Sequence, residues 1–305
     1  MSEAAVSEIR LAAEVWREER RAHEARVAAL TAPRLSRAAL GRPDPVEDFL
    51  FTYYPFRPSA LRRWSPGRGV ALADAAELVD GARFERRADG LVSVVAPDAK
   101  ERERLAFSLR LCRAVAGREA RHACFGLHEW AMVFADAAGR RHRSWPLRLG
   151  PEGTDRVVRS LPLRCTHYDA YRFFTPAARP LNQEAPTLEA RADNEQPGCV
   201  HANMDLYKWA MKASPWIPSA LAADCFELAA EARLLDMRAS PYDFSAAGLE
   251  PVRIETPEGR AEYETSQRAV MKKAEPLRLR LIAALERAMQ RDFSFASGRL
   301  PEQSF

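Results

Sequence analysis

The chain has 305 residues, of which 47% are hydrophobic, and a formal net charge of +4 at pH 7. This length and composition provide for a sizeable core, and we expect one globular domain over residues 1–305. No run of 18 apolar residues occurs, which excludes a membrane-spanning helix, while the mild positive charge permits nucleic-acid binding without arguing for it.

The N-terminus and the cysteines predict the cellular compartment. The first 26 residues carry mixed charge and no apolar segment, so they resemble neither a signal peptide nor a transit peptide. The cysteines are odd in number and widely spaced: Cys112, Cys124, Cys165, Cys199 and Cys225. We therefore expect reduced thiols, a cytoplasmic protein and no membrane partner.

The first half of the chain predicts helices around one hairpin. A long surface helix is expected over residues 3–31, capped by Ser2 and closed by Pro33. Short helical turns broken by prolines follow in the aromatic and basic stretch 44–69. The pattern of 84–95 around Asp89-Gly90 is typical of a β-hairpin, and 98–117 reads as a helix.

The second half predicts further strands and then helices. We expect a second hairpin over 128–149 and a strand over 163–174. Three helices should follow, over 201–212, over 218–237, and from Thr256 onward with a kink or break at Pro276, before a loose tail over 294–305. The fold class is thus α+β, helix-dominated, with a small central antiparallel sheet of hairpins.

One predicted helix, HANMDLYKWAMK, carries a narrow polar stripe on an otherwise apolar surface. At 100° per residue, its ionisable residues fall within a stripe roughly 60° wide: His201, Asp205, Lys208 and Lys212. Two interpretations stay open. The stripe is either the exposed edge of a buried helix, or the wall of a pocket in which Asp205 and Lys208 act as an acid/base pair.

Two Cys-x-His units, each followed by an aspartate, have the residue types of a catalytic or metal site. They are Cys165, His167 and Asp169, and Cys199, His201 and Asp205. On a strand the first three side chains would share one face. These ligand types suit zinc or iron, although their spacing is unlike any compact zinc motif.

His128 and Glu129 interrupt an apolar run in a similar way. One interpretation is a hydrogen-bonded histidine at a strand end beside a glutamate that faces water. The other is a catalytic role for one of the two, because neighbouring residues of a strand point to opposite faces.

The segment 51–68 interleaves aromatic and basic side chains: Phe51, Tyr53, Tyr54, Phe56 and Trp64 with Arg57, Arg62, Arg63 and Arg68. Aromatic rings stack on nucleobases and guanidinium groups bind phosphate, so the composition suits nucleic acid. An aromatic core segment with outward-facing Arg heads would have the same composition.

The strings VEDFLFTYYPFRP, GLHEWAMVF, YDAYRFFTPAARP and GCVHANMDLYKWAMK resemble a bacterial family common in actinobacteria, whose members usually carry the label 3-methyladenine DNA glycosylase. The likeness spans about residues 15–290. It implies a DNA-repair hydrolase that removes alkylated bases, with DNA as its partner and no cofactor. That chemistry needs an aromatic pocket for the extruded base, a carboxylate, and positive charge for the flanking phosphates.

On this resemblance, Asp205 is the expected carboxylate, with His201 and Lys208 beside it. Further catalytic candidates are His167, Asp169, His128 and Glu129. The expected base pocket consists of Tyr168, Tyr171, Phe173 and Trp209. The expected DNA contacts are Arg57, Arg62, Arg63 and Arg68.

Two other functions remain open from the sequence. The first is an enzyme acting on a small molecule, with a zinc or iron ion held by residues of 165–169 and 199–205. The second is a binding protein without catalytic activity.

Overall fold

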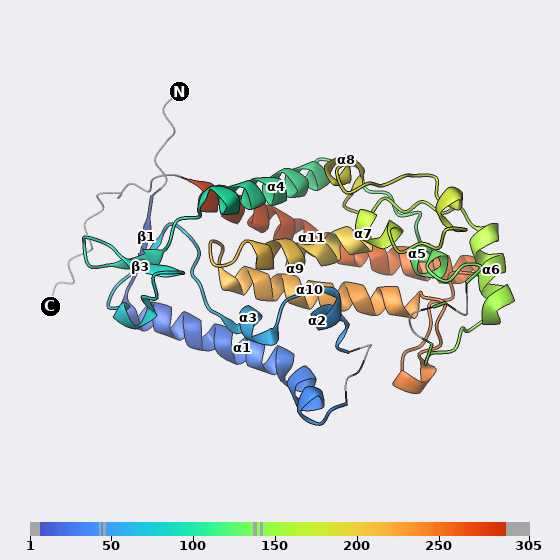
Figure 1. Cartoon of the computed structure of the whole chain (residues 1–305), viewed down its shortest axis with the longest axis horizontal. Helices are drawn as coiled ribbons and strands as arrows, with labels where there is room; N and C mark the ends of the chain where they lie inside the picture. Colours follow the sequence, from blue (N-terminus) through green and yellow to red (C-terminus); the bar gives the residue numbers. More distant parts are fainter. Residues whose placement is uncertain (1–6, 43, 45–46, 137–138, 141–142, 291–305) are drawn as a thin grey trace. The chain divides into compact units, whose positions relative to one another are not determined.

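The computed structural model describes residues 7–42, 44, 47–136, 139–140 and 143–290 (Figure 1). The chain divides into two compact units. Unit 1 comprises Met1–Leu109, Ala210–Ala223 and Leu281–Phe305, and unit 2 comprises Arg110–Trp209 and Asp224–Arg280. The number of independently folding domains stays a prediction. No helix in the described part of the chain is both long and apolar enough to cross a bilayer.

Unit 1 contains a small mixed sheet. Among the described residues its strands are β1 (Ile9–Leu11), β2 (Val70–Leu72), β3 (Phe84–Arg86) and β4 (Val92–Val94), in the spatial order β1-β2-β4-β3. The predicted hairpin is confirmed, because β3 and β4 pair antiparallel on either side of Asp89-Gly90. β1 pairs parallel to β2, so the sheet is mixed rather than wholly antiparallel.

The helices of unit 1 include α1 (Ala13–Ala39), α2 (Phe49–Tyr53), α3 (Pro58–Arg62), η1 (Ala76–Leu78) and the first part of α4 (Ala99–Ala116). Trp16 of α1 stacks on Trp64 with ring centroids 6.0 Å apart, and its indole N–H donates to the carbonyl of Ala73 just after β2. This buried pair forms the centre of the core of unit 1.

The predicted bounds of the first helix are wrong at both ends. Residues 9–11 form β1, because their backbone pairs with β2 more than 50 residues later, an interaction that no local pattern encodes. Pro33 lies inside α1, which continues to Ala39. Residues 3–6 and the expected loose tail at 294–305 lie outside the described residues.

Unit 2 is helical. It contains α5 (Leu127–Ala131), α6 (Gly150–Ser160), α7 (Tyr168–Tyr171), η2 (Arg179–Leu181), α8 (Arg191–Asn194), η3 (Ser245–Ala247), and its share of α4, α9 (Val200–Lys212), α10 (Ser219–Arg238) and α11 (Pro257–Met289). α9, α10 and α11 lie side by side (Figure 1). Tyr207 packs on Phe226, and Arg278 donates to Asn203 at 2.6 Å. α11 continues through Pro276 without a break.

The second predicted hairpin, over 128–149, is wrong. Phe125 and Gly126 take left-handed backbone angles, with φ of 49° and 72°, and turn the chain directly into α5. In α5 the apolar side chains of Leu127, Trp130 and Ala131 are buried at i, i+3 and i+4, which is helical spacing. The Trp130 indole N–H donates to the carbonyl of Ala239 beyond α10, so the tertiary contact favours the helix.

The predicted strand over 163–174 is also wrong. Leu163 makes only an isolated bridge with Asn182, and residues 168–171 form α7. Ala170 is buried in α7, and the backbone N–H of Tyr171 donates to the carbonyl of His167 at 3.0 Å, so the chain makes a helical turn here. The fold class itself, α+β and helix-dominated with a small sheet, is confirmed.

Candidate functional site

A cysteine, a histidine and an aspartate of unit 2 form a continuous chain of contacts. Cys124 precedes α5 and its Sγ lies 3.2 Å from Nδ1 of His128, one helical turn later. Nε2 of His128 lies 2.7 Å from Oδ1 of Asp236 on α10. His128 and Asp236 are buried, whereas Cys124 is partly exposed. The left-handed turn at Phe125 and Gly126 brings Cys124 back onto His128.

Electrostatics fix the charges of this chain of contacts. Burial alone would lower the pKa of His128, but the charge and hydrogen bond of Asp236, together with the contact with Cys124, outweigh it and hold the pKa well above its ordinary value. Burial would raise the pKa of Asp236, yet His128, and to a lesser degree Arg233, hold it well below its ordinary value. The favoured state is therefore an imidazolium paired with a carboxylate.

Glu129 and His201 surround the same aspartate. Arg233 donates to Glu129 at 3.0 Å and to Asp236 at 3.1 Å. Burial, together with the charge of Asp236, raises the pKa of Glu129 to about 7. The His201 ring packs edge-on against His128 with centroids 4.6 Å apart, and burial lowers the pKa of His201 to about 3, so this ring is neutral.

A second buried network adjoins the first, and it contains two of the four residues of the polar stripe of α9. Asp205, which is fully buried, accepts hydrogen bonds from Arg191 at 2.9 Å and from Lys208 at 2.8 Å. Lys208 also donates to Asp169 at 2.6 Å, and Nε2 of His167 lies 3.3 Å from Asp205. Asp205 and Lys208 therefore form neither an exposed edge nor an open pocket wall, because ion pairs occupy both, whereas Lys212 at the end of the stripe is exposed.

The stacked rings of His167 and His201 join the two networks, with centroids 5.3 Å apart. The structure thus gathers all of the predicted catalytic candidates in one unit: His128, Glu129, His167, Asp169, His201, Asp205 and Lys208. Their catalytic roles stay predictions. Lys212 belongs to unit 1.

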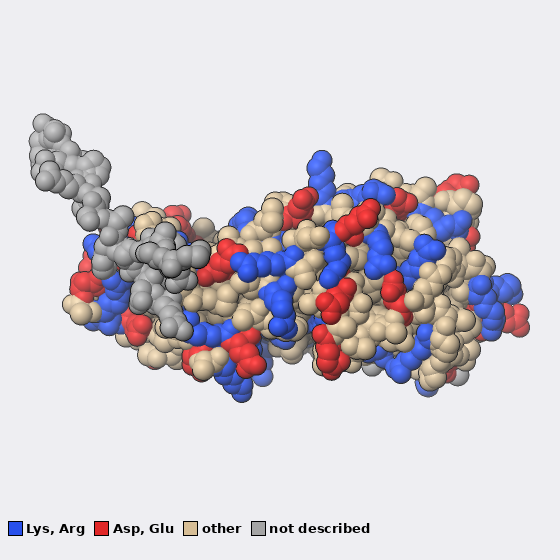
Figure 2. Space-filling view, turned by 90° about the horizontal axis from the view of Figure 1, so that it is seen from above, with Lys and Arg blue, Asp and Glu red and all other residues tan. Residues whose placement is uncertain are grey.

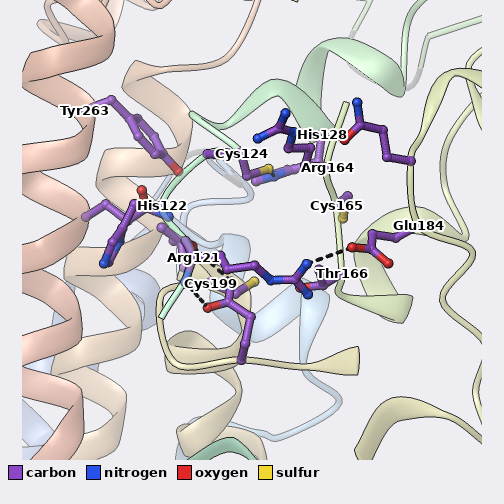
Figure 3. Close-up of a pocket in the computed structure, with 15 residues that line it drawn as sticks. Arg121, His122, Cys124, His128, Arg164, Cys165, Thr166, Glu184, Cys199 and Tyr263 are labelled. Atoms are coloured by element: carbon purple, nitrogen blue, oxygen red, sulfur yellow. Dashed lines mark hydrogen bonds and ion pairs between the residues drawn. The ribbon is translucent and has the colours of Figure 1, made fainter. Parts of the chain in front are cut away.

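A pocket of about 420 Å³ opens beside Cys124 (Figure 3). Its lining includes Cys124, His128, Cys165, Cys199, Tyr263 and Gln267, with Arg121 and Arg164 among its polar side chains. Arg121 is paired with Glu184 at 2.7 Å. Of the first network, Cys124 and His128 line this pocket, whereas Glu129, His201 and Asp236 do not.

The expected base pocket does not coincide with the pocket beside Cys124. None of Tyr168, Tyr171, Phe173 and Trp209 lines the 420 Å³ pocket. Trp209 is 4% exposed and lies under the cations of Arg191 and Lys208, at 5.2 and 4.7 Å from the ring centroid. Its ring therefore covers the second network.

The aromatic and basic segment 51–68 belongs to unit 1. Tyr54 and Trp64 are buried in its core, so these rings cannot stack on nucleobases. Arg57, Arg62 and Arg63 are exposed, which matches the alternative of a core segment with outward Arg heads. Arg68 donates to the carbonyls of Ala288 and Gln290 and so serves the structure. On the face in Figure 2, basic and acidic side chains are interspersed rather than separated.

Sequence reasoning missed several residues of the two networks. Cys124, Asp236 and Arg233 complete the first network, and Arg191 with Glu195 completes the second, where Arg191 donates to Glu195 at 2.6 Å. Cys124 alone carried a local signal, because it precedes His128 by one helical turn. Asp236 lies 108 residues from its histidine, so no spacing in the sequence links them.

Comparisons with known proteins add no relative: no family model matches the chain, and neither a curated protein nor a solved structure is significantly similar to it.

Proposed function

We propose that the chain is an enzyme acting on a small polar acyl compound by nucleophilic catalysis, with Cys124 as the nucleophile. The observation that carries the proposal is the alignment of Cys124, His128 and Asp236 at 3.2 and 2.7 Å beside the 420 Å³ pocket. A nucleophile in contact with a base, and a base oriented by a third group, are the requirements of this chemistry.

The proposed reaction follows from the contacts. Because the imidazolium is favoured, the reacting form is an ion pair in which the proton of the Cys124 thiol lies on Nδ1 of His128, while Nε2–H of the ring donates to Asp236. The thiolate attacks the acyl carbon, and the leaving amine or alcohol departs with the proton from His128. Water then hydrolyses the thioester and restores the thiol. Asp236 holds the ring in the required tautomer and stabilises the imidazolium.

Neighbouring groups support this assignment over the other thiols of the pocket. Burial raises the pKa of Cys165 and of Cys199, so both favour the unreactive thiol form. Arg164 at the pocket favours a substrate that carries a carboxylate or phosphate, whereas the charge of Arg121 is already paired with Glu184. All five cysteines are free, which supports our proposal of a cytoplasmic, reducing location.

The test is site-resolved alkylation of the folded chain with iodoacetamide, quantified by peptide mass spectrometry at pH 6.5. We expect Cys124 to react at least about ten-fold faster than Cys199, which lines the same pocket without a histidine at its sulfur. His128→Gln should remove most of that difference, with circular dichroism confirming that the variant folds. Equal rates at the two cysteines would overturn the proposal.

A substrate screen is the second test of the proposed function. Small amides and esters that bear an anionic group are offered to the wild-type chain, to Cys124→Ser and to the matched control Cys199→Ser. Turnover should disappear in the first variant and persist in the second. Turnover that survives Cys124→Ser would place the chemistry on other residues.

DNA glycosylase activity, implied by the family resemblance, is the second candidate. The observation that favours it is the exposure of Arg57, Arg62 and Arg63, which leaves them available to phosphates. The same preparations are assayed for release of 3-methyladenine from alkylated DNA. Release that requires Asp205 and not Cys124 would support this candidate against the first.

A further inference from the structure

The first network contains the side chains of a metal site. One ligand atom each from His128, Glu129, His201 and Asp236 can be chosen such that all four lie within 4.8 Å of one another. They come from three helices, α5, α9 and α10, and three of the four residues are buried. Two imidazoles with two carboxylates suit zinc and neighbouring divalent transition metals.

The outer contacts of the four side chains are those expected around a metal. Nδ1 of His128 contacts the sulfur of Cys124, which leaves Nε2 as the ligand atom facing the cluster. Arg233 holds both carboxylates, at 3.0 and 3.1 Å. Such contacts orient ligands and fix the histidine tautomer.

The charge of Arg233 also sets the strength of the site. A guanidinium already beside Glu129 and Asp236 repels a second cation, and the His128–Asp236 hydrogen bond must break before the metal binds. Both effects weaken binding relative to a structural zinc site, so we expect occupancy that is reversible rather than permanent.

We propose that this centre binds a zinc-class divalent ion through His128, Glu129, His201 and Asp236, and that the bound ion switches off Cys124. The ion takes the place of the proton on Nε2 of His128, and that proton is released to water. The metal-bound ring keeps its one proton on Nδ1, so it can neither accept the proton of the Cys124 thiol nor pair with the thiolate as an imidazolium. The binding step stands by itself, whereas the switching step rests on the proposed function.

Binding is tested by titrating the chain with zinc sulfate in a calorimeter and by counting bound metal after dialysis. We expect one equivalent of zinc, and an affinity at least about ten-fold weaker in His201→Ala and in Glu129→Gln. His122→Ala, which changes a pocket histidine outside the cluster, is the matched control and should bind like wild type. No binding, or binding unchanged by His201→Ala, would overturn the site.

Cys124→Ser distinguishes the proposed site from one in which the Cys124 thiol is itself a zinc ligand. This variant should keep its zinc, because Cys124 is not a proposed ligand, and loss of zinc binding in it would overturn the ligand set.

Switching is tested by the ratio of Cys124 alkylation rates with and without zinc. We expect zinc to slow alkylation at least about ten-fold, EDTA to restore the rate, and His201→Ala to bring the ratio near one. Zinc binding that leaves the rate unchanged would overturn the switch alone. Slow alkylation without metal would instead count against the proposed function.

Discussion

Replacing Asp205 by Asn removes one negative charge from the middle of the second network. The carboxylate is fully buried and accepts hydrogen bonds from Arg191 at 2.9 Å and Lys208 at 2.8 Å. Breaking a buried ion pair from one side costs about 3–5 kcal/mol, because the remaining charges lose their partner. The amide oxygen still accepts one hydrogen bond, which returns about 1 kcal/mol.

The expected net loss is therefore about 2–4 kcal/mol of unfolding free energy. For a chain of this size that corresponds to a melting temperature lower by roughly 3–6 °C. Thermal melting followed by circular dichroism, with urea unfolding as a second measure, gives both quantities.

Lys273→Met provides the control in the same unit. Its ammonium pairs with Glu231, but both side chains are largely exposed, at 59% and 42%. The loss of such a pair costs about 0–1 kcal/mol. If Asp205→Asn melts within about 1 °C of wild type, or higher, the ion-pair reasoning is refuted and the carboxylate is a desolvated functional group, as in a pocket wall.

Three further predictions concern acid, backbone and nucleic acid. The charges of Lys208 and Arg191 outweigh burial and hold the pKa of Asp169 below its ordinary value. The Asp169 carboxylate therefore stabilises the fold fully above pH about 4, and this stabilisation is lost as the pH falls further. Urea unfolding between pH 5 and 3 should show the loss of stability, and the loss should be smaller in Lys208→Met. Gly126→Ala should destabilise the chain by about 2–4 kcal/mol in urea melts, because φ is 72° and the new Cβ would lie 3.0 Å from the Cβ of Ala239. Gly248→Ala is the control: its φ is 73° but the space around it is open, so the change should cost only about 1–2 kcal/mol. If the chain binds DNA, changing Arg62 and Arg63 to Ala should lower the log–log salt slope of affinity by roughly 1–2, and a slope that does not change would exclude these contacts.

The sequence predicts the fold where a pattern is long or its turn is chemically specific. The hairpin at 84–95 is correct because Asp89-Gly90 supplies the turn, and helices α4, α9, α10 and α11 are correct because their apolar periodicity extends over several turns. The short apolar runs at 128–134 and 163–174 fit both periods. Contacts such as that of Trp130 with Ala239 decide between them, and these contacts are not local.

The site is predictable in part for the same reason. His201 and Asp205 lie one helical turn apart, so their proximity follows from α9 alone. Tertiary packing alone brings Asp205 to Arg191 and His128 to Asp236. The two residues of the first pair are 14 positions apart in the sequence and those of the second are 108 apart, so no local pattern links them. Residue types therefore indicate the chemistry that a site can perform. Which partner each side chain contacts is set by the fold, and the partner decides whether a carboxylate is part of an ion pair or a catalytic acid.

The stacked indoles of Trp16 and Trp64 give unit 1 an optical signature of its own. Two buried rings 6.0 Å apart and inclined by 29° couple their electronic transitions, so the pair should dominate the near-ultraviolet circular dichroism of that unit. Every cysteine lies in unit 2, so the rate at which the buried Cys225 thiol reacts with an alkylating reagent reports on the unfolding of that unit alone. Coincident loss of the two signals in urea would make the chain one cooperative unit, and separate midpoints would make it two.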